Sequence, residues 1–468
     1  MRTTAFLLLF FINSLSSSAQ NSDTQYAMPL SAVIKDIEAR YGITIRDPEK
    51  LVPGKTITYA QWRYRVDVEQ TLSNVLTSVD LVAQKEGDKK YKLKKYQYHR
   101  TTVEEGKEKL EYLSGLYHDQ ASWENRKAEL RTCMLKALQL DPLPESPGSK
   151  PIITNKRKMN GYTIENIAIE TLAGLYVCGS IYKPSIIKGK APIILSPNGH
   201  IPIGRYHESV QVRCAMLARM GAIVMNYDLF AYGESLLQFK PEDHRRSLAM
   251  TIQALNSFRI LDYLASLPKA DPERIAITGA SGGGSHSMLM TALDDRIKVS
   301  VPVVMLSCYF YGGCPCESGM PIHLCGKGTN NVELAAMAAP RPQLVISDGG
   351  DWSDHVPEIE YPYLQKIYNY YNKTENIENA HFPDEGHDYA CSKRAPMYRF
   401  MAKHLGLDIK VVQNKAGELD ESGCTIEETK AMLVFGEDRI HMHDNAIKSF
   451  DELEKVFNNT FRSDSHPQ

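Results

Sequence analysis

The sequence lacks several features that would assign it to common classes of protein. After residue 20, no stretch approaches the ~18 consecutive apolar residues that a membrane-spanning helix needs. Lysine and arginine number 54 against 56 aspartate and glutamate residues, which gives a formal net charge of −2. This balance gives no reason to expect nucleic acid or an anionic membrane as a partner. No repeat or low-complexity run interrupts the 468 residues, which suffice for a large core plus an accessory module.

Cysteine is too sparse to form a disulfide scaffold, and its odd count of nine leaves at least one residue unpaired. The one cluster is Cys314-Pro315-Cys316, with Cys308, His323 and Cys325 close by. A zinc site needs four well-placed ligands, and C-P-C is not typical of a zinc knuckle. We therefore predict no metal and no cofactor, and we interpret the cluster as a disulfide or as packing.

The first twenty residues have the pattern of a secretory signal peptide. Arg2 supplies positive charge, residues 5–12 are apolar, and Ser16-Ser17-Ser18-Ala19 offers small residues for cleavage. The first cysteine is Cys133, so a lipid anchor at the cleavage site is not expected. We predict that residues 1–20 are removed and that the mature protein is exported without a transmembrane segment.

Residues 25–95 form a predicted small α+β domain. Apolar residues at helical spacing from Leu30 to Tyr41 stop at Gly42, and short strands are predicted at 43–45, 56–59, 81–84 and 91–93. The stretch "MPLSAVIKDIEARYGITI…VDVEQTLSNVLTSVDLVAQ" resembles the short N-terminal domain of secretins and TonB-dependent receptors. This resemblance implies a domain that docks a protein partner, and with the signal peptide it implies the periplasm or outer surface of a Gram-negative bacterium.

Residues 96–150 are charged and helical, with an apolar stripe that includes Trp123, Leu130 and Met134, and they are predicted to cap the next domain. In residues 151–468 strands alternate with helices. An antiparallel pair is predicted at 162–170 and 175–182, and further strands at 193–196, 222–227, 274–278, 299–306 and 343–346. Such alternation favours a mostly parallel sheet covered by helices on both faces.

The most informative motif is Gly279-Ala280-Ser281-Gly282-Gly283, a G-x-S-x-G between a predicted strand and a predicted helix. This order is that of the nucleophile elbow of α/β-hydrolases, in which small neighbours let a strained serine project above the sheet. The motif predicts an α/β-hydrolase fold for residues 151–468, with Ser281 as the nucleophile.

In that fold the acid follows the next-to-last strand and the histidine follows the last. "PQLVISDGGDWSDHVPE" offers Asp348, Asp351 and Asp354, and a position in the loop a few residues beyond the strand favours Asp351. In "NAHFPDEGHDYA" the histidine of the glycine-containing loop, His387, is favoured over His381 within the strand. We predict that His387 is the general base and that Asp351 orients it.

Two backbone N–H groups are needed to stabilise the oxyanion, and Gly282 and His200 are predicted to supply them. Gly282 follows the nucleophile, and His200 ends the turn of "PIILSPNGH". For the ring of His200, contact with substrate and a plain role in the loop both remain open. "YDLFAYGES" is interpreted as a structural turn below the active-site loop.

The motifs "WENRKAELR", "GYTIENIAIETLAGLYVCGSIYKP", "PIILSPNGH", "GASGGG", "AAPRPQLVISDGGDW" and "GHDY" together resemble exported bacterial carbohydrate esterases related to acetyl-xylan esterases and dienelactone hydrolases. The resemblance covers roughly residues 105–460. It implies removal of acetyl groups from a plant polysaccharide or oligosaccharide, or of methyl groups from pectic uronates, and it makes Glu317 and His323 candidate sugar contacts. A serine peptidase or a non-catalytic glycan-binding protein are the alternatives.

Overall fold

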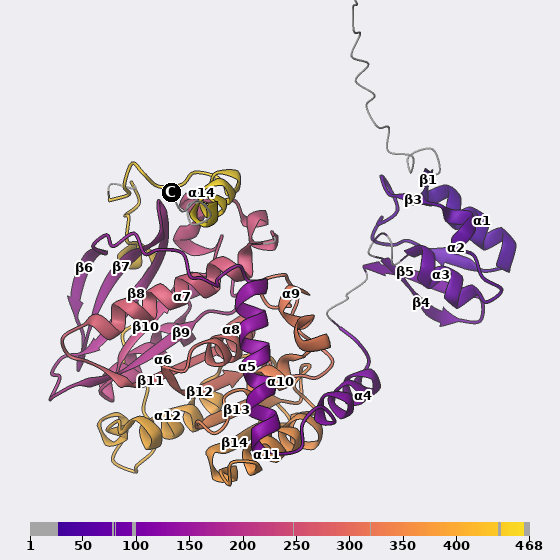
Figure 1. The fold of residues 1–468 in the computed structure, drawn as a ribbon. Coiled ribbons are helices and arrows are strands. Elements are labelled where there is room, and N and C mark those ends of the chain that lie inside the picture. Colours follow the sequence, from indigo (N-terminus) through magenta and orange to yellow (C-terminus); the bar gives the residue numbers. More distant parts are fainter. Residues whose placement is uncertain are drawn as a thin grey trace, which may run out of the picture. The chain divides into compact units, whose positions relative to one another are not determined.

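The computed structural model describes residues 27–462, apart from residues 77, 78, 80, 96–99, 247, 319, 439 and 440. The predicted signal peptide lies outside the described residues. The chain divides into two units, Met1–Tyr98 and His99–Gln468, whose elements are labelled in Figure 1. Within the described part of the chain, no helix combines the length and the apolar character that crossing a membrane requires.

The N-terminal unit has the predicted α+β character. Helix α1 ends at Gly42, which adopts the left-handed conformation (φ 62°) typical of a helix C-terminus. β2 pairs with β5 in parallel, β4 pairs with β5 antiparallel, and β1 pairs with β3. The elements are β1 (Ala27–Pro29), α1 (Leu30–Tyr41), β2 (Thr44–Arg46), β3 (Thr56–Thr58), α2 (Ala60–Arg63), α3 (Val68–Leu76), β4 (Leu81–Gly87) and β5 (Lys90–Lys95).

The second unit is built on a nine-stranded sheet in the order β14-β13-β12-β11-β9-β10-β8-β7-β6. The strands from β14 to β10 run parallel, and β8, β7 and β6 are antiparallel to their neighbours. The strands are β6 (Ile152–Lys158), β7 (Tyr162–Leu172), β8 (Leu175–Pro184), β9 (Ala191–Pro197), β10 (Ile223–Tyr227), β11 (Ala270–Ala280), β12 (Ile297–Val303), β13 (Gln343–Asp348) and β14 (Ile377–Phe382).

Helices cover both faces of this sheet, because successive side chains of a strand point to opposite sides. Ile193 and Leu195 of β9 belong to a core with α5, α7, α8, α10 and α11, whereas Ile194 belongs to a second core with α6 and α12. The helices are α4 (Val103–Ser114), α5 (Gln120–Ala137), α6 (Glu208–Arg219), α7 (Ala249–Ser266), α8 (Gly282–Leu293), α9 (Met320–His323), α10 (Asn331–Ala336), α11 (Tyr361–Asn369), α12 (Cys391–Leu405), α13 (Thr429–Met432) and α14 (Phe450–Arg462). The predicted α/β-hydrolase fold is confirmed.

One predicted strand is too long. The apolar run 299–306 was expected to be a single strand, but β12 ends at Val303. Val304 has a φ of 46°, a backbone conformation that β-branched residues rarely adopt and that ends the extended run. The chain leaves the sheet at this point, and the following residues form one side of the candidate site.

An ion pair and a disulfide join helix α5 to the segment that follows β12. The guanidinium of buried Arg126 donates to both carboxylate oxygens of Glu333, each at 2.9 Å. Cys133 of α5 forms a disulfide with Cys325, at a sequence separation of 192. The cysteine cluster of the sequence is therefore divided, because Cys325 pairs outside it.

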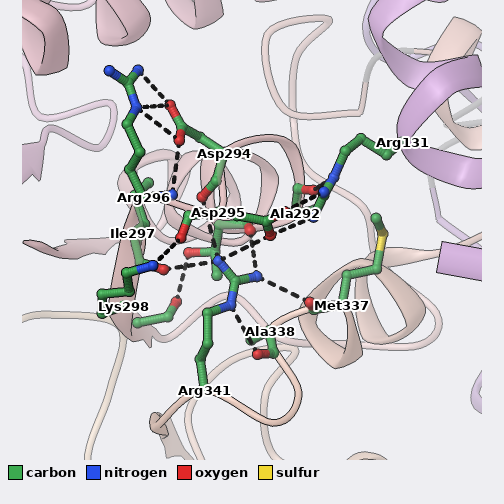
Figure 2. A network of polar contacts seen from close by, with 12 residues as sticks. Arg131, Ala292, Asp294, Asp295, Arg296, Ile297, Lys298, Met337, Ala338 and Arg341 are labelled. Carbon is green, nitrogen blue, oxygen red and sulfur yellow. Dashed lines mark hydrogen bonds and ion pairs between the residues drawn. The ribbon is translucent and has the colours of Figure 1, made fainter. Parts of the chain in front are cut away.

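Figure 2 shows the network that holds the far end of α8. The side chain of Arg341 donates to the carbonyl oxygens of Thr291, Asp294, Ile297, Met337 and Ala338. Arg131 of α5 binds the Asp295 carboxylate beside it, with an N–O distance of 2.6 Å. The bond to Thr291, and one from Nε of Arg131 to the Ala292 carbonyl at 2.9 Å, satisfy carbonyls that α8 leaves unpaired at its C-terminus. They hold in place the helix whose N-terminus follows Ser281.

Candidate active site

Ser281 lies at the sharp turn between β11 and α8. Its φ of 56° and ψ of −125° are unfavourable for a residue with a side chain, as is typical of strained functional positions. The backbone holds this conformation, because the Ser281 N–H donates to the Val303 carbonyl at 3.0 Å. A Cβ at Gly283 would lie 2.5 Å from the Pro197 oxygen, so only glycine allows the turn to approach β9 this closely.

Asp351 and His387 meet beyond the ends of β13 and β14. Nδ1 of His387 donates to Oδ2 of Asp351 at 2.5 Å. The other oxygen, Oδ1, accepts from the backbone N–H and the hydroxyl of Ser353, both at 2.6 Å. Because Nδ1 is the donor to the carboxylate, Nε2 is the nitrogen left to act as a base.

The alternative side chains have other partners. Asp348 forms an ion pair with Lys393 at 3.1 Å, and both side chains are fully buried. Asp354 accepts a hydrogen bond from the hydroxyl of Tyr309 at 2.9 Å. His381, within β14, lies 2.9 Å from the hydroxyl of Ser347.

A cavity of about 410 Å³ opens onto the serine. The side chain of Trp352 lines this cavity, and the centre of its ring lies 4.7 Å from the centre of the His387 ring. His387 therefore lies next to a wall of the cavity. A larger cavity, of about 620 Å³, lies between α4 and α11 and is lined by none of the predicted site residues. The lining of the smaller cavity consists of His200, Tyr232, Pro241, His244, Arg245, Ser281, Phe310, Gly313, Cys314, Glu317 and Trp352.

The loop after β9 lies directly against the nucleophile. A Cβ at Gly199 would be 2.6 Å from the Ala280 oxygen and 3.1 Å from Cβ of Ser281. A Cβ at Gly282 would be 2.8 Å from Cε1 of His200. The two residues predicted to donate the oxyanion N–H groups therefore lie close together beside Ser281.

Buried polar side chains support that loop from below. Arg205, fully buried, donates to Asp228 at 3.0 Å and forms a second ion pair with Glu234. Burial raises the pKa of Asp228 to about 6, although the Arg205 guanidinium acts in the opposite direction. Gly233 has a φ of 55°, and a Cβ there would lie 2.4 Å from the Asp228 carboxyl group. The "YDLFAYGES" segment thus forms the tight turn expected of it.

The two candidate sugar contacts differ in position. Glu317 lines the cavity, is buried, and accepts from the Gly313 N–H at 2.8 Å. Burial raises its pKa. His323 does not line the cavity; its ring stacks on Tyr311 with centres 4.5 Å apart, and Nε2 lies 3.1 Å from the Asn331 side-chain oxygen.

Sequence reasoning missed His244 and Arg245 on the cavity wall. Both follow Pro241 in a 3₁₀ turn, η5 (Pro241–Arg245), and no motif distinguishes them in the sequence. Cys314 was noticed only as part of the cysteine cluster, and the structure places it beside His200 and His244 instead of His323.

Three comparisons with known proteins agree on the kind of protein. The model of the acetyl xylan esterase family matches residues 244–312, which include the nucleophile elbow. The 4-O-methyl-glucuronoyl methylesterase 1 of Sodiomyces alcalophilus is 32% identical over 122 residues, which are 25% of this chain and 22% of that protein. The match thus spans about a fifth of that relative's length. Among solved structures, Methylesterase BT1017 is 47% identical, with a TM-score of 0.80, and the alignment covers 95% of this chain and 99% of that one.

The fold and these similarities define a carbohydrate esterase, a carboxylic ester hydrolase with an α/β-hydrolase fold. Because nearly the whole length of both chains aligns, the protein belongs to the same family as Methylesterase BT1017.

Proposed function

We propose that the protein removes methyl groups from methyl-esterified uronates of plant polysaccharides, through an acyl-enzyme on Ser281. The observation that carries the proposal is the 2.5 Å hydrogen bond between His387 and Asp351. It accompanies the strained backbone conformation of Ser281 at the turn between β11 and α8. Methyl esters are favoured over acetyl esters because both the 47% identical structure and the 32% identical relative are named methylesterases. The acetyl xylan esterase match keeps acetyl removal as the second candidate.

In the proposed reaction the Ser281 hydroxyl attacks the ester carbonyl carbon while Nε2 of His387 takes the hydroxyl proton. The Asp351 carboxylate stabilises the imidazolium, and the N–H groups of Gly282 and His200 stabilise the oxyanion. The bond between the carbonyl carbon and the methoxy oxygen breaks, and His387 donates its proton to that oxygen, which leaves as methanol. Water then attacks the acyl-enzyme, loses its proton to His387, and releases the free uronate while Ser281 regains its hydroxyl.

Arg245 supports an acidic substrate. Its side chain is exposed on the cavity wall, and its positive charge acts on His200 within the cavity. A guanidinium binds carboxylates in a bidentate manner, so it suits a free uronate next to the esterified one. Acetylated xylan backbone offers no such charge. We therefore propose Arg245 as the residue that selects a partly de-esterified acidic chain.

The test compares methanol release from partly methylated oligogalacturonides with acetate release from acetylated xylan. We expect methanol release by the wild-type protein, and its loss in Ser281→Ala. Arg245→Gln should raise KM on the charged oligosaccharide with little change in kcat. Arg246→Gln is the matched control, since Arg246 contacts Phe450 and lies 3.8 Å from Glu454. Preferential release of acetate, or equal effects of the two arginine variants, would reject the uronate assignment.

For the other parts of the chain we propose export directed by residues 1–20 and a docking role for the N-terminal unit. The disulfide between Cys133 and Cys325 supports an oxidising compartment such as the periplasm. Cell fractionation tests the export proposal, because removal of residues 2–20 should leave the protein in the cytoplasm.

The docking proposal is tested by deletion of residues 27–98. The deletion should change the protein partners recovered by cross-linking without abolishing ester hydrolysis. Loss of hydrolysis would contradict an independent docking unit.

A further inference from the structure

Four side chains of the kind that bind metals meet beside the cavity. His200 comes from the loop after β9, His244 from η5, and Cys314 and Cys316 from the segment between β12 and α9. One nitrogen or sulfur atom of each lies within 4.8 Å of those of all the others. His244, Cys314 and Cys316 are buried, and the proposed ester hydrolysis uses none of the four side chains.

The four atoms enclose a single point. Nε2 of His200 lies 2.9 Å from Nε2 of His244, 3.2 Å from Sγ of Cys314 and 3.1 Å from Sγ of Cys316. Sγ of Cys314 lies 3.4 Å from Nε2 of His244 and 2.7 Å from Sγ of Cys316. Tetrahedral zinc, with Zn–S near 2.3 Å and Zn–N near 2.0–2.1 Å, places its ligand atoms about 3.3–3.8 Å apart. Outward shifts of about half an ångström per ligand atom would reach that geometry.

A hydrogen bond on the outer nitrogen of His244 orients its ring for metal binding, and a carboxylate lies near the outer nitrogen of His200. Nδ1 of His244 lies 2.6 Å from the carbonyl oxygen of Phe230, an acceptor only, so Nδ1 carries the proton. Nε2 of His244 therefore carries a free lone pair, and it lies 3.4 Å from Sγ of Cys314. Nδ1 of His200 lies 3.7 Å from the carboxylate of Glu317. Pairing of a carbonyl or a carboxylate with the outer nitrogen is usual for histidines that bind zinc.

We propose that His200, His244, Cys314 and Cys316 bind one Zn²⁺ ion in a closed tetrahedral site. Binding converts two thiols into thiolates and releases two protons, and two thiolates neutralise the dication in this buried place. This zinc site differs from the sequence-based prediction of no metal. Local spacing did not indicate it, because His244 and His200 lie at least 70 and 114 residues before the cysteines.

The main competing state is a disulfide between Cys314 and Cys316. Their sulfurs are 2.7 Å apart, longer than the ~2.05 Å of an S–S bond. Zinc accounts for all four side chains with one ion.

The site has a positioning role. With four protein ligands the ion has no open position for substrate, which is typical of structural zinc. It would join the loop that bears His200 to the wall that bears Cys314, and both line the cavity next to Ser281. Loss of the ion should therefore loosen the loop that the proposed reaction uses for its oxyanion N–H group. The metal assignment itself is independent of whether the ester is methyl or acetyl.

The test begins with the full chain, purified without a histidine tag from the periplasmic fraction. Elemental mass spectrometry should find one zinc per chain in the wild-type protein. Cys314→Ser should reduce zinc affinity by more than the ~10–100-fold typical of outer-sphere changes. Cys391→Ser is the matched control, since this exposed cysteine lies outside the cluster, and it should retain zinc.

A second measurement does not depend on the variants folding. Cobalt added to the chelated wild-type protein should give the intense visible bands of a tetrahedral ion and a thiolate-to-cobalt charge-transfer band. The weak spectrum of an octahedral ion would overturn the proposal. So would an intact-mass and peptide analysis that finds Cys314 bonded to Cys316 in the purified protein, or zinc-free protein whose two thiols are freely alkylated in the presence of zinc.

Discussion

Replacement of Asp351 by asparagine is the sharpest test of the proposed triad. Oδ1 of Asp351 accepts two hydrogen bonds from Ser353, both at 2.6 Å, one of them from the backbone N–H. In Asp351→Asn the amide oxygen must occupy this position, because the N–H of Ser353 needs an acceptor. The amide NH₂ then faces His387 and donates to Nδ1, so the ring proton moves to Nε2. A protonated Nε2 cannot accept the proton of Ser281.

The expected loss follows from this tautomer. The equivalent change in serine proteases lowers kcat by about 10⁴, which corresponds to about 5 kcal/mol of transition-state free energy. We expect a similar decrease in kcat for methanol release with KM nearly unchanged, because Asp351 does not line the cavity. The assay is steady-state kinetics on a methylated oligogalacturonide.

The two neighbouring aspartates serve as controls. Asp354→Asn keeps an oxygen that can accept from Tyr309, so kcat should stay close to wild type. Asp348→Asn removes one partner of buried Lys393, which keeps Asp388 at 2.9 Å. The free energy of unfolding should therefore fall by less than the ~3–5 kcal/mol of an unpaired buried charge, with kcat retained in the folded protein. A normal kcat in Asp351→Asn, or an equal loss in Asp354→Asn, would refute the assignment.

Three further predictions concern the glycine turn, acid stability and the disulfide. Gly199→Ala should lower kcat about 10²-fold, because the added Cβ displaces the loop from Ser281. Gly87→Ala is the control, since a Cβ there would meet open space. Equal kinetics of the two variants would contradict the close approach of Gly199 to Ser281. Burial lowers the pKa of His286 from 6.5 to about 4, so the unfolded chain takes up a proton first as pH falls. The wild-type protein should lose about 2 kcal/mol of unfolding free energy between pH 7 and pH 5 from this group, up to about 3 kcal/mol by pH 4, and His286→Gln should lack that loss in urea titrations. The same pH slope in both proteins would exclude His286 as the cause. Cys133→Ser should lower the unfolding free energy by up to about 5 kcal/mol by the chain-entropy relation for a loop of this length; an unchanged urea midpoint would show that the bridge does not form.

Much of the fold could be predicted from local patterns. Buried strands such as residues 193–196 and the helix 248–267 are visible as apolar runs of the right length, because the side-chain period of each element is a local property. The end of β12 was misjudged, since residues 304–306 remain apolar and the turn at Val304 depends on neighbouring contacts. Apolar character indicates burial, and it does not distinguish a strand from an irregular buried segment.

The sequence alone determined the α/β-hydrolase class, the strand–turn–helix around Ser281 and the order of the candidate residues after it, because each depends on short-range spacing within one or two elements. Only the tertiary structure decided which aspartate bonds to His387 and which cysteine pairs with Cys133. It also decided that His244 meets His200, which lies 44 residues earlier. Those pairings depend on which loops meet in space. Packing between segments far apart in the chain decides that, and the local sequence of one segment does not indicate its partner.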